Sequence, residues 1–174
     1  MFTRLPTGPF LLLILVLTAL LSCAGCENPQ GVRIGHTAPG ISGNDIHGEY
    51  VSLSQLKGKV VVIYFWTNSC CAVSLKQLEP FYRLQKHNGL EILAINELNS
   101  EKEVQSYAKN NALTFTMLTD ERSMLSEQYG AFGFPTIFIL DREGTVREKI
   151  LGNMQTAKLE KLTSAYFKQK SHQP

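Results

Sequence analysis

The chain alternates between short runs of consecutive apolar residues and stretches in which apolar residues recur every three or four positions. The runs have the length and the β-branched and aromatic content that strands prefer. They cover residues 50–53, 60–66, 91–96, 115–118, 136–140 and 145–150. Residues 60–66 (VVVIYFW) are apolar throughout, and such a run indicates a strand covered on both faces, at the centre of a parallel sheet.

Helical spacing separates these runs and closes the chain. The apolar positions that carry it are Leu75, Leu78, Phe81 and Tyr82 in one helix and Leu159, Leu162 and Tyr166 in the last. Pro80 lies inside the first pattern and predicts a kink or a break. Residues 100–103 (SEKE) form a capping box that opens a further helix. Asp120 is placed to cap a helix over residues 123–129, which Gly130 then ends.

Strands and helices therefore follow the predicted order β-α-β-α-β-α-β-β-α. Such alternation predicts one α/β domain, over residues 41–170, with a central mixed, mostly parallel sheet and helices on both faces. The turn residues 141–144 (DREG) predict a hairpin that adds an antiparallel edge. A composition of 44% hydrophobic and 18% charged residues suits one globular domain. The net charge of +2 argues against a nucleic-acid partner, which would select a clustered basic face.

Residues 1–22 read as an export signal, with one early charge, an apolar run of signal-peptide length and a small residue before a cysteine. This order resembles a bacterial lipoprotein signal, in which the cysteine after the cleavage site carries lipid. Cys23 fits that position best and Cys26 is the second choice. A plain secreted protein or an uncleaved anchor is the alternative. We expect residues 23–40 to be a tether that holds the domain at the membrane of the cell envelope, facing the periplasm or the exterior.

Two adjacent cysteines, Cys70 and Cys71, follow the apolar run 60–66 and precede the first helical pattern. In open α/β sheets, sites form where strands end and helices begin. A thiol there is close to free backbone N–H groups and to the positive end of the helix dipole, which favour the thiolate and its nucleophilic attack. The alternative is a pair of buried structural cysteines. The placement predicts a reactive Cys70.

Two segments resemble the thioredoxin-like superfamily. Residues 58–66 (GKVVVIYFW) run into a cysteine, and residues 133–136 (GFPT) lead into a second strand. The pattern is most similar to membrane-anchored thiol-disulfide oxidoreductases of the TlpA/ResA type, related to the redoxin and AhpC/TSA group. The resemblance implies a thioredoxin-like fold with an N-terminal β extension. It also implies a cis Pro135 facing the cysteines, with Trp66, Phe134 and Pro135 contacting the substrate. For Trp66, a place in the core is the equal alternative.

The chain departs from this family at the second active-site cysteine. The family uses Cys-x-x-Cys, whereas here the tetrad is Cys-Cys-Ala-Val, with Val73 at the second position. Cys71 is a possible replacement. Adjacent Cα atoms lie about 3.8 Å apart, however, and disulfides usually span roughly 4.4–6.8 Å between Cα atoms. We therefore expect a Cys70–Cys71 bond to be strained and an external thiol to resolve the reaction more easily.

Three functions remain open at this stage. The first is an extracytoplasmic thiol-disulfide oxidoreductase, a monomer that acts on protein thiols or disulfides through Cys70, either alone or with Cys71. The second is a thiol peroxidase, because Thr67 and Cys70 have the Thr-x-x-Cys spacing of peroxiredoxins. The third is a non-catalytic module in redox or cytochrome assembly. Adjacent thiolates are a poor chelate for a tetrahedral metal, so we expect no metal and no cofactor.

Overall fold

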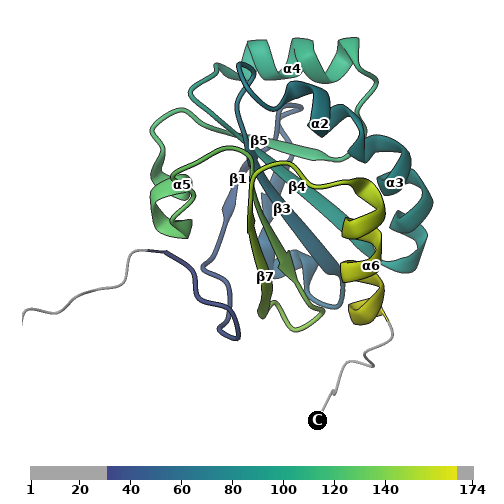
Figure 1. The fold of residues 1–174 in the computed structure, drawn as a ribbon. Coiled ribbons are helices and arrows are strands. Elements are labelled where there is room, and N and C mark those ends of the chain that lie inside the picture. Colours follow the sequence, from purple (N-terminus) through teal and green to yellow (C-terminus); the bar gives the residue numbers. More distant parts are fainter. Residues whose placement is uncertain (1–30, 168–174) are drawn as a thin grey trace, which may run out of the picture.

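The computed structural model describes residues 31–167, so the predictions on the export signal, Cys23 and Cys26 lie outside the described residues. Five strands form a central sheet in the order β5-β4-β3-β6-β7 (Figure 1). Their bounds are Val60–Trp66 for β3, Leu90–Glu97 for β4, Thr116–Asp120 for β5, Thr136–Leu140 for β6 and Val146–Leu151 for β7. Each apolar run between residues 60 and 150 that was predicted as a strand therefore forms one. β3 and β6 begin and end at the predicted residues.

The sheet is mixed. β3 pairs in parallel with β4, and β4 in parallel with β5. β6 is antiparallel to both β3 and β7. The antiparallel part thus reaches further than the predicted edge hairpin, because β6 itself lies inside the sheet beside the central strand. All seven residues of β3 are buried, as their apolar run predicts. The expected α/β class is confirmed.

Helices cover both faces of the sheet (Figure 1). Their bounds are Leu53–Leu56 for η1, Ala72–Lys76 for α2, Leu78–Gln85 for α3, Lys86–Asn88 for η2, Glu101–Asn110 for α4, Met124–Tyr129 for α5 and Thr156–Phe167 for α6. One apolar core contains side chains of α2, α3, α4 and α6. The core on the opposite face contains side chains of α5 and Ile41, which precedes β1 (Ser42–Asn44). Successive side chains of β3 point alternately into the two cores, so both faces of this central strand are buried.

The residues predicted to break, cap and end helices do so in the structure. The helix around Pro80 is broken at Gln77 into α2 and α3, so the proline occupies the first turn of a new helix, where its missing N–H costs little. The Asp120 carboxylate accepts hydrogen bonds from the backbone N–H groups of Leu125 and Ser126 at 3.1 and 2.8 Å. Gly130 ends α5 in the left-handed conformation, with φ of 65°, which glycine adopts without a steric penalty.

The N-terminal extension is a two-stranded hairpin of β1 (Ser42–Asn44) and β2 (Tyr50–Ser52). The apolar runs of the sequence do not predict β1, whose residues Gly43 and Asn44 pair with Val51 and Tyr50 of β2. The described part of the expected tether, residues 31–40, lies against the domain. Its backbone donates from Gly35 N–H to Val146 O at 2.8 Å, and Pro39 O accepts from the Tyr129 hydroxyl at 2.6 Å. The folded unit therefore begins before residue 41.

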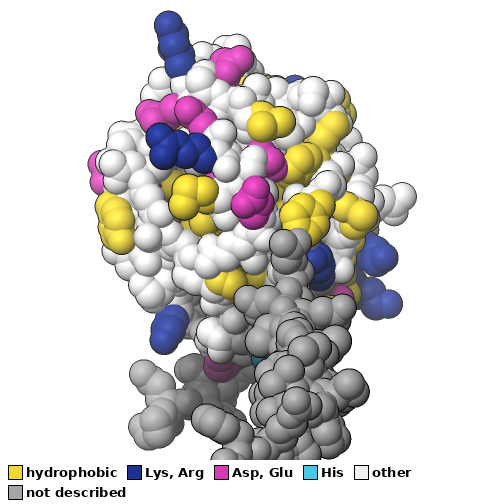
Figure 2. Space-filling model, turned by 90° about the vertical axis from the view of Figure 1, so that its left-hand side faces the viewer, with side chains coloured by type: hydrophobic (Ala, Val, Ile, Leu, Met, Phe, Trp, Pro, Cys, Tyr) yellow, Lys and Arg dark blue, Asp and Glu magenta, His cyan; other side chains and the backbone are white. Residues whose placement is uncertain are grey.

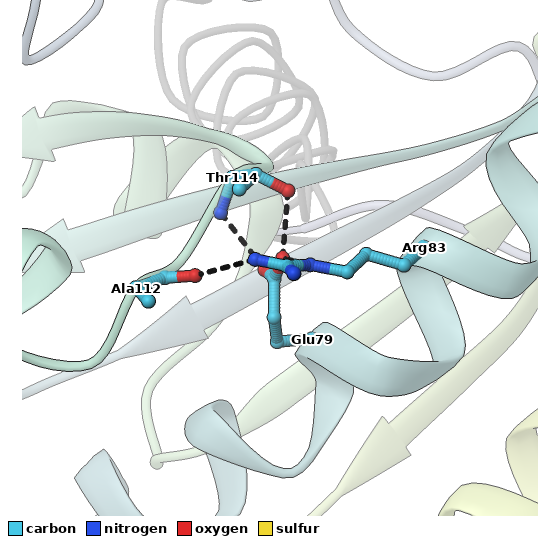
Figure 3. Close-up of polar contacts among 4 residues, drawn as sticks. All are labelled: Glu79, Arg83, Ala112 and Thr114. Atoms are coloured by element: carbon cyan, nitrogen blue, oxygen red, sulfur yellow. Dashed lines mark hydrogen bonds and ion pairs between the residues drawn. The ribbon is translucent and has the colours of Figure 1, made fainter.

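A buried carboxylate joins α3 to the segment before β5 (Figure 3). Glu79 accepts hydrogen bonds from the backbone N–H and the hydroxyl of Thr114 at 2.8 and 2.7 Å, and it pairs with Arg83 at 2.5 Å. Arg83 also donates to Ala112 O at 3.1 Å. Burial works to raise the pKa of Glu79, but the bonds from Thr114 and Arg83 outweigh it and lower that pKa.

Between residues 31 and 167, no helix has both the length and the apolarity needed to cross a membrane.

Candidate active site

The two adjacent cysteines lie in the turn that joins β3 to α2. Cys71 is the residue that caps the N-terminus of α2, and its N–H donates to Thr67 O at 3.3 Å. The Cys70 residue is exposed, whereas Cys71 is only 1% exposed and belongs to an apolar core. Cys70 therefore lies at a helix start and in contact with solvent, as the sequence predicts for a reactive thiol.

A disulfide joins the sulfurs of Cys70 and Cys71. Their Cα atoms are 3.8 Å apart, the separation that the sequence analysis used to argue against an easy bond. The bond forms across this separation, and the expectation that it is strained stays a prediction. Because the bond is present, the chain holds an internal partner for Cys70 even though Val73 replaces the second cysteine of the usual motif.

The Cys70 sulfur also contacts a buried hydroxyl. Thr67 Oγ1 lies 3.3 Å from Cys70 Sγ and 3.0 Å from Ser69 Oγ, and Thr67 is 6% exposed. A thiolate has no proton to donate. When Cys70 is ionised, Thr67 is therefore the donor in this contact, and Ser69 can donate to Thr67 in turn. The arrangement supplies a hydrogen bond to the negatively charged form of the nucleophile, which stabilises it.

An asparagine network attaches this turn to the end of β4. The buried Asn96 side chain donates to Asn68 Oδ1 at 3.3 Å and accepts from Asn99 N–H at 3.3 Å. The Asn99 side chain in turn accepts from Asn68 N–H at 3.2 Å. Leu98, which lies between Asn96 and Asn99 in the sequence, has a φ of 72°. This left-handed conformation is rare for a leucine. The network ties the cysteine turn to a neighbouring strand.

Two tyrosines lie under α2. The Tyr64 hydroxyl of β3 is 3.1 Å from Ser74 Oγ, and Ser74 Oγ donates to Cys71 O at 2.9 Å. The Tyr107 hydroxyl of α4 donates to Ala72 O. Burial raises the pKa of Tyr64 and also that of Tyr107, so both phenols stay protonated at neutral pH and remain hydrogen-bond donors.

The loop before β6 reaches the same end of the sheet as the cysteines. The Phe134–Pro135 peptide bond is cis, which confirms the expectation drawn from the family resemblance. Phe65 of β3 is paired with Thr136, so Pro135 lies beside the end of β3 from which the cysteine turn departs. Phe134 is partly buried and contacts both apolar cores. This arrangement is consistent with the substrate-binding role expected for Phe134 and Pro135.

Trp66 occupies a different place from the one expected of a substrate-binding residue. Its side chain is 0% exposed and packs on Tyr107, with 5.1 Å between ring centroids. A side chain without exposed surface does not contact a substrate in this conformation. The structure thus places Trp66 in the core, the alternative that the sequence left open. Its indole N–H has no hydrogen-bond partner among residues 31–167.

A groove of about 270 Å³ lies beside Cys70. It is lined by Cys70, Val73, Ser74, Gln77, Asn153, Met154 and Gln155. Apart from the cysteine, none of these lining residues has an ionisable side chain. Val73 is 76% exposed, so an exposed apolar side chain lies where the family has its second cysteine.

Large apolar side chains are exposed around this end of the sheet. The strands β3, β4, β5 and β7 end here and β6 begins here. The exposed apolar residues that follow or precede these strand ends are Val73, Leu98, Met124, Phe132 and Leu151. We call these five residues the apolar rim. Figure 2 shows exposed apolar side chains on the side of the molecule that carries α5. Large exposed apolar residues at one end of a fold are candidates for an interaction surface.

The AhpC/TSA family model matches residues 34–149, which include the hairpin, the cysteine turn and the cis-proline loop. The chain belongs to the AhpC/TSA family. Within it, the chain is of the TlpA/ResA type. It is 30% identical over 156 residues to the thiol-disulfide oxidoreductase ResA of Bacillus cereus, covering 84% of this chain and 90% of that protein. It is also 30% identical over 123 residues to the sporulation thiol-disulfide oxidoreductase A of Bacillus subtilis, covering 68% and 74%.

Solved structures are similar over most of the chain. The thioredoxin domain of a thiol-disulfide oxidoreductase from Bacteroides vulgatus has a TM-score of 0.66 and 28% identity, covering 76% of this chain and 99% of that one. StoA from Bacillus subtilis has a TM-score of 0.63 and 26% identity, covering 72% and 96%. The predicted thioredoxin-like fold is confirmed.

Proposed function

We propose that this member of the family is a thiol-disulfide oxidoreductase that acts on protein thiols and disulfides, with Cys70 as its single nucleophile toward the substrate. One observation carries the proposal: the exposed residue Cys70 is disulfide-bonded to the buried residue Cys71 at the turn before α2. The names of the related oxidoreductases from Bacillus species support the same reaction class.

In the reducing direction, the Cys70 thiolate attacks one sulfur of a substrate disulfide. A Cys70–substrate disulfide forms, and the other substrate sulfur leaves as a thiolate that takes up a proton. Thr67 favours this step by donating a hydrogen bond to the Cys70 thiolate before attack. The attack requires access to Cys70, which its exposure provides.

The mixed disulfide must then be resolved. Val73 has no thiol, and Cys71 is the thiol bonded to Cys70 in the oxidised structure. We assign it the resolving step. The Cys71 thiolate attacks Cys70 Sγ, the Cys70–Cys71 disulfide forms and the second substrate thiolate leaves. A dithiol reductant returns the pair to the reduced state, and the reverse sequence oxidises a substrate dithiol. Resolution by an external thiol is the alternative. If Cys71 resolves the mixed disulfide, the Cys70–substrate disulfide persists in Cys71→Ser.

The surface near Cys70 favours a polypeptide as the substrate. The groove beside Cys70 has no lysine, arginine, aspartate or glutamate among its lining residues, so it offers no ion pair to a small charged disulfide such as oxidised glutathione. The apolar rim, in contrast, matches a peptide segment with apolar side chains on either side of its cysteine. The cis-proline loop lies at the same end of the sheet. Protein substrates are therefore the class we assign.

The location is part of the proposal. The order of charge, apolar run and small residue over residues 1–22 supports export, and Cys23 is the residue that would carry the lipid. The folded domain, as a monomer, would then work on the outer side of the membrane, where disulfides persist. Metabolic labelling with a radioactive fatty acid tests the anchor. Label must enter the wild type and be lost in Cys23→Ser while Cys26→Ser keeps it.

The reaction itself is tested by reduction of insulin with dithiothreitol as the electron donor. The wild type should accelerate precipitation of the insulin B chain, and Cys70→Ser should fall to the uncatalysed rate. Cys26→Ser is the matched control and should keep full activity. Equal rates for Cys70→Ser and wild type would overturn the proposal. A wild type with no activity and two unreactive thiols would leave the third function, a non-catalytic module.

A thiol peroxidase is the second candidate, because the contact of Thr67 Oγ1 with Cys70 Sγ at 3.3 Å realises the Thr-x-x-Cys spacing of peroxiredoxins. The groove beside Cys70, however, has no arginine among its lining residues. Hydrogen peroxide distinguishes the two functions. Rapid conversion of Cys70 to a sulfenic acid, seen by mass spectrometry after dimedone trapping, supports the peroxidase. Slow oxidation together with rapid exchange with disulfides supports the oxidoreductase.

A further inference from the structure

Two hydroxyl groups donate hydrogen bonds to the backbone at the start of α2, and a third contacts one of these two. Ser74 Oγ donates to Cys71 O at 2.9 Å, and Tyr64 Oη lies 3.1 Å from Ser74 Oγ. The Tyr107 hydroxyl donates to the next carbonyl, Ala72 O. These residues come from β3, α2 and α4, so three separate elements contribute. We call Tyr64, Ser74 and Tyr107 the hydroxyl clamp.

The direction of the hydrogen bonds in the clamp is fixed. A serine hydroxyl has one proton, and Ser74 uses it to bond Cys71 O. Tyr64 is therefore the donor to Ser74. Tyr64 is 2% exposed, so its hydroxyl has little access to water, and loss of Ser74 leaves it without this partner. The chain of bonds runs from a buried strand to the backbone of one cysteine.

We propose that the hydroxyl clamp is a positioning device that holds Cys71 beneath Cys70 in the reduced protein, so that Cys71 releases the substrate from Cys70. The proposal rests on the proposed function and adds three residues to it. Neither tyrosine nor serine touches a reacting sulfur through a described hydrogen bond, and each acts through the backbone of α2.

The backbone of Cys71 is held on both sides of its Cα atom. Its N–H donates to Thr67 O at 3.3 Å, and its C=O accepts from Ser74 Oγ at 2.9 Å and from Leu75 N–H at 3.0 Å. Cys71 is also buried. When the disulfide opens, Cys70 can therefore turn outward toward a substrate while the backbone of Cys71 keeps its place. Closing the bond again then requires mainly that Cys70 return.

Fixing one reactant in this way raises the effective concentration of the Cys71 thiol at the mixed disulfide. In the closing step, Cys71 S⁻ attacks Cys70 Sγ, the Cys70–substrate bond breaks and the substrate leaves as a thiolate. No further oxidant is needed. Loss of one clamp hydrogen bond should lower the effective concentration about fivefold, the value expected for a typical net hydrogen bond. It should not change attack by Cys70, because the clamp does not contact the Cys70 sulfur.

The test equilibrates the protein with mixtures of reduced and oxidised glutathione, traps free thiols by alkylation and measures each species by mass. The variants are Tyr64→Phe, Ser74→Ala and Tyr107→Phe, and Ser74→Thr restores the hydroxyl. Tyr50→Phe is a matched control, because Tyr50 is 62% exposed on β2 and is not part of the clamp. Thermal unfolding of each variant, followed by circular dichroism, shows that it is folded.

We expect the equilibrium constant for forming the Cys70–Cys71 disulfide to fall about fivefold in each of Tyr64→Phe, Ser74→Ala and Tyr107→Phe. The Cys70–glutathione species should rise correspondingly, and Ser74→Thr and Tyr50→Phe should match the wild type. Unchanged equilibria in the folded clamp variants, with an active wild type, would overturn the clamp alone. A wild type that never forms the Cys70–Cys71 disulfide would overturn both the clamp and the resolving step assigned to Cys71.

Discussion

Cys70 and Cys71 share a disulfide, yet their environments are opposite: Cys70 is exposed and Cys71 is 1% exposed. A bulky protein substrate can reach only the first of these sulfurs. In the proposed mechanism this asymmetry assigns the two residues different tasks, attack by Cys70 and release by Cys71. It also compensates for Val73, because the chain keeps a buried second thiol at a new position.

The contact of Thr67 with the nucleophile leads to the first prediction. Thr67→Val keeps the shape of this buried side chain but removes its hydroxyl, so the Cys70 thiolate loses a hydrogen-bond donor. Hydrogen bonds to charged groups are worth about 1.5–3 kcal/mol. Alkylation of reduced Cys70 by iodoacetamide at neutral pH should therefore slow about tenfold.

The control for this measurement is Thr145→Val, because Thr145 lies in the hairpin between β6 and β7, away from the cysteine turn. It should be alkylated at the wild-type rate. Equal alkylation rates for Thr67→Val and the wild type would show that the Thr67 hydroxyl does not stabilise the thiolate.

The apolar rim leads to a prediction about substrate choice. Phe132 is 69% exposed beside the cis-proline loop, and Phe132→Ala removes apolar surface that a peptide would cover. KM for a protein disulfide should rise about fivefold, from about 1 kcal/mol of lost burial, while the rate with hydroxyethyl disulfide stays the same. Leu84→Ala is the matched control, since Leu84 is 66% exposed on α3. An equal loss on both substrates would argue against a peptide-binding rim.

The core of the fold could be predicted from the sequence because its signals are local. The predicted run Val60–Trp66 begins and ends at the same residues as β3. An uninterrupted apolar run and its flanking turns can be recognised in the sequence without knowledge of tertiary contacts. The cis bond before Pro135 came from the family resemblance. The strand of Gly43 and Asn44 was missed because these residue types favour turns, and only pairing with β2 overrides that preference.

The surroundings of the cysteines could not be predicted in the same way. Asn96 reaches Asn68 because β3 and β4 pair in a register that places Trp66 beside Asn96. Neither segment alone determines this register. Tyr107 meets Ala72 across 35 residues of sequence. The Cα separation of Cys70 and Cys71 predicts that a bond between them is strained, but the sequence does not show that their sulfurs are bonded, which the structure does.

The buried Glu79 leads to a prediction about stability and pH. Hydrogen bonds from Thr114 and Arg83 lower the pKa of Glu79 from the ordinary 4.5. The stabilisation of the fold by the Glu79 carboxylate is therefore complete above pH 4.5. It is lost as the pH falls through the lower pKa of the folded state. Glu79→Gln should reduce the free energy of unfolding at pH 7 by about 2 kcal/mol, measured by urea denaturation.

The difference between Glu79→Gln and the wild type should shrink as the pH is lowered below 4.5, because the wild-type carboxylate is then protonated as well. Glu143→Gln, at an exposed position of the hairpin turn, should follow the wild type throughout. A constant difference between Glu79→Gln and the wild type from pH 7 to pH 3 would contradict the assigned role of the carboxylate.

The most direct test of the account is capture of the reaction intermediate. Reduced wild type, Cys70→Ser and Cys71→Ser are each mixed with oxidised insulin, quenched with acid and alkylated, and the products are identified by peptide mass spectrometry. The account predicts a persistent Cys70–insulin disulfide in Cys71→Ser, a Cys70–Cys71 disulfide in the wild type and no adduct in Cys70→Ser. An insulin adduct on Cys71 formed as fast as the one on Cys70, or equal persistence of the Cys70 adduct in wild type and Cys71→Ser, would contradict it.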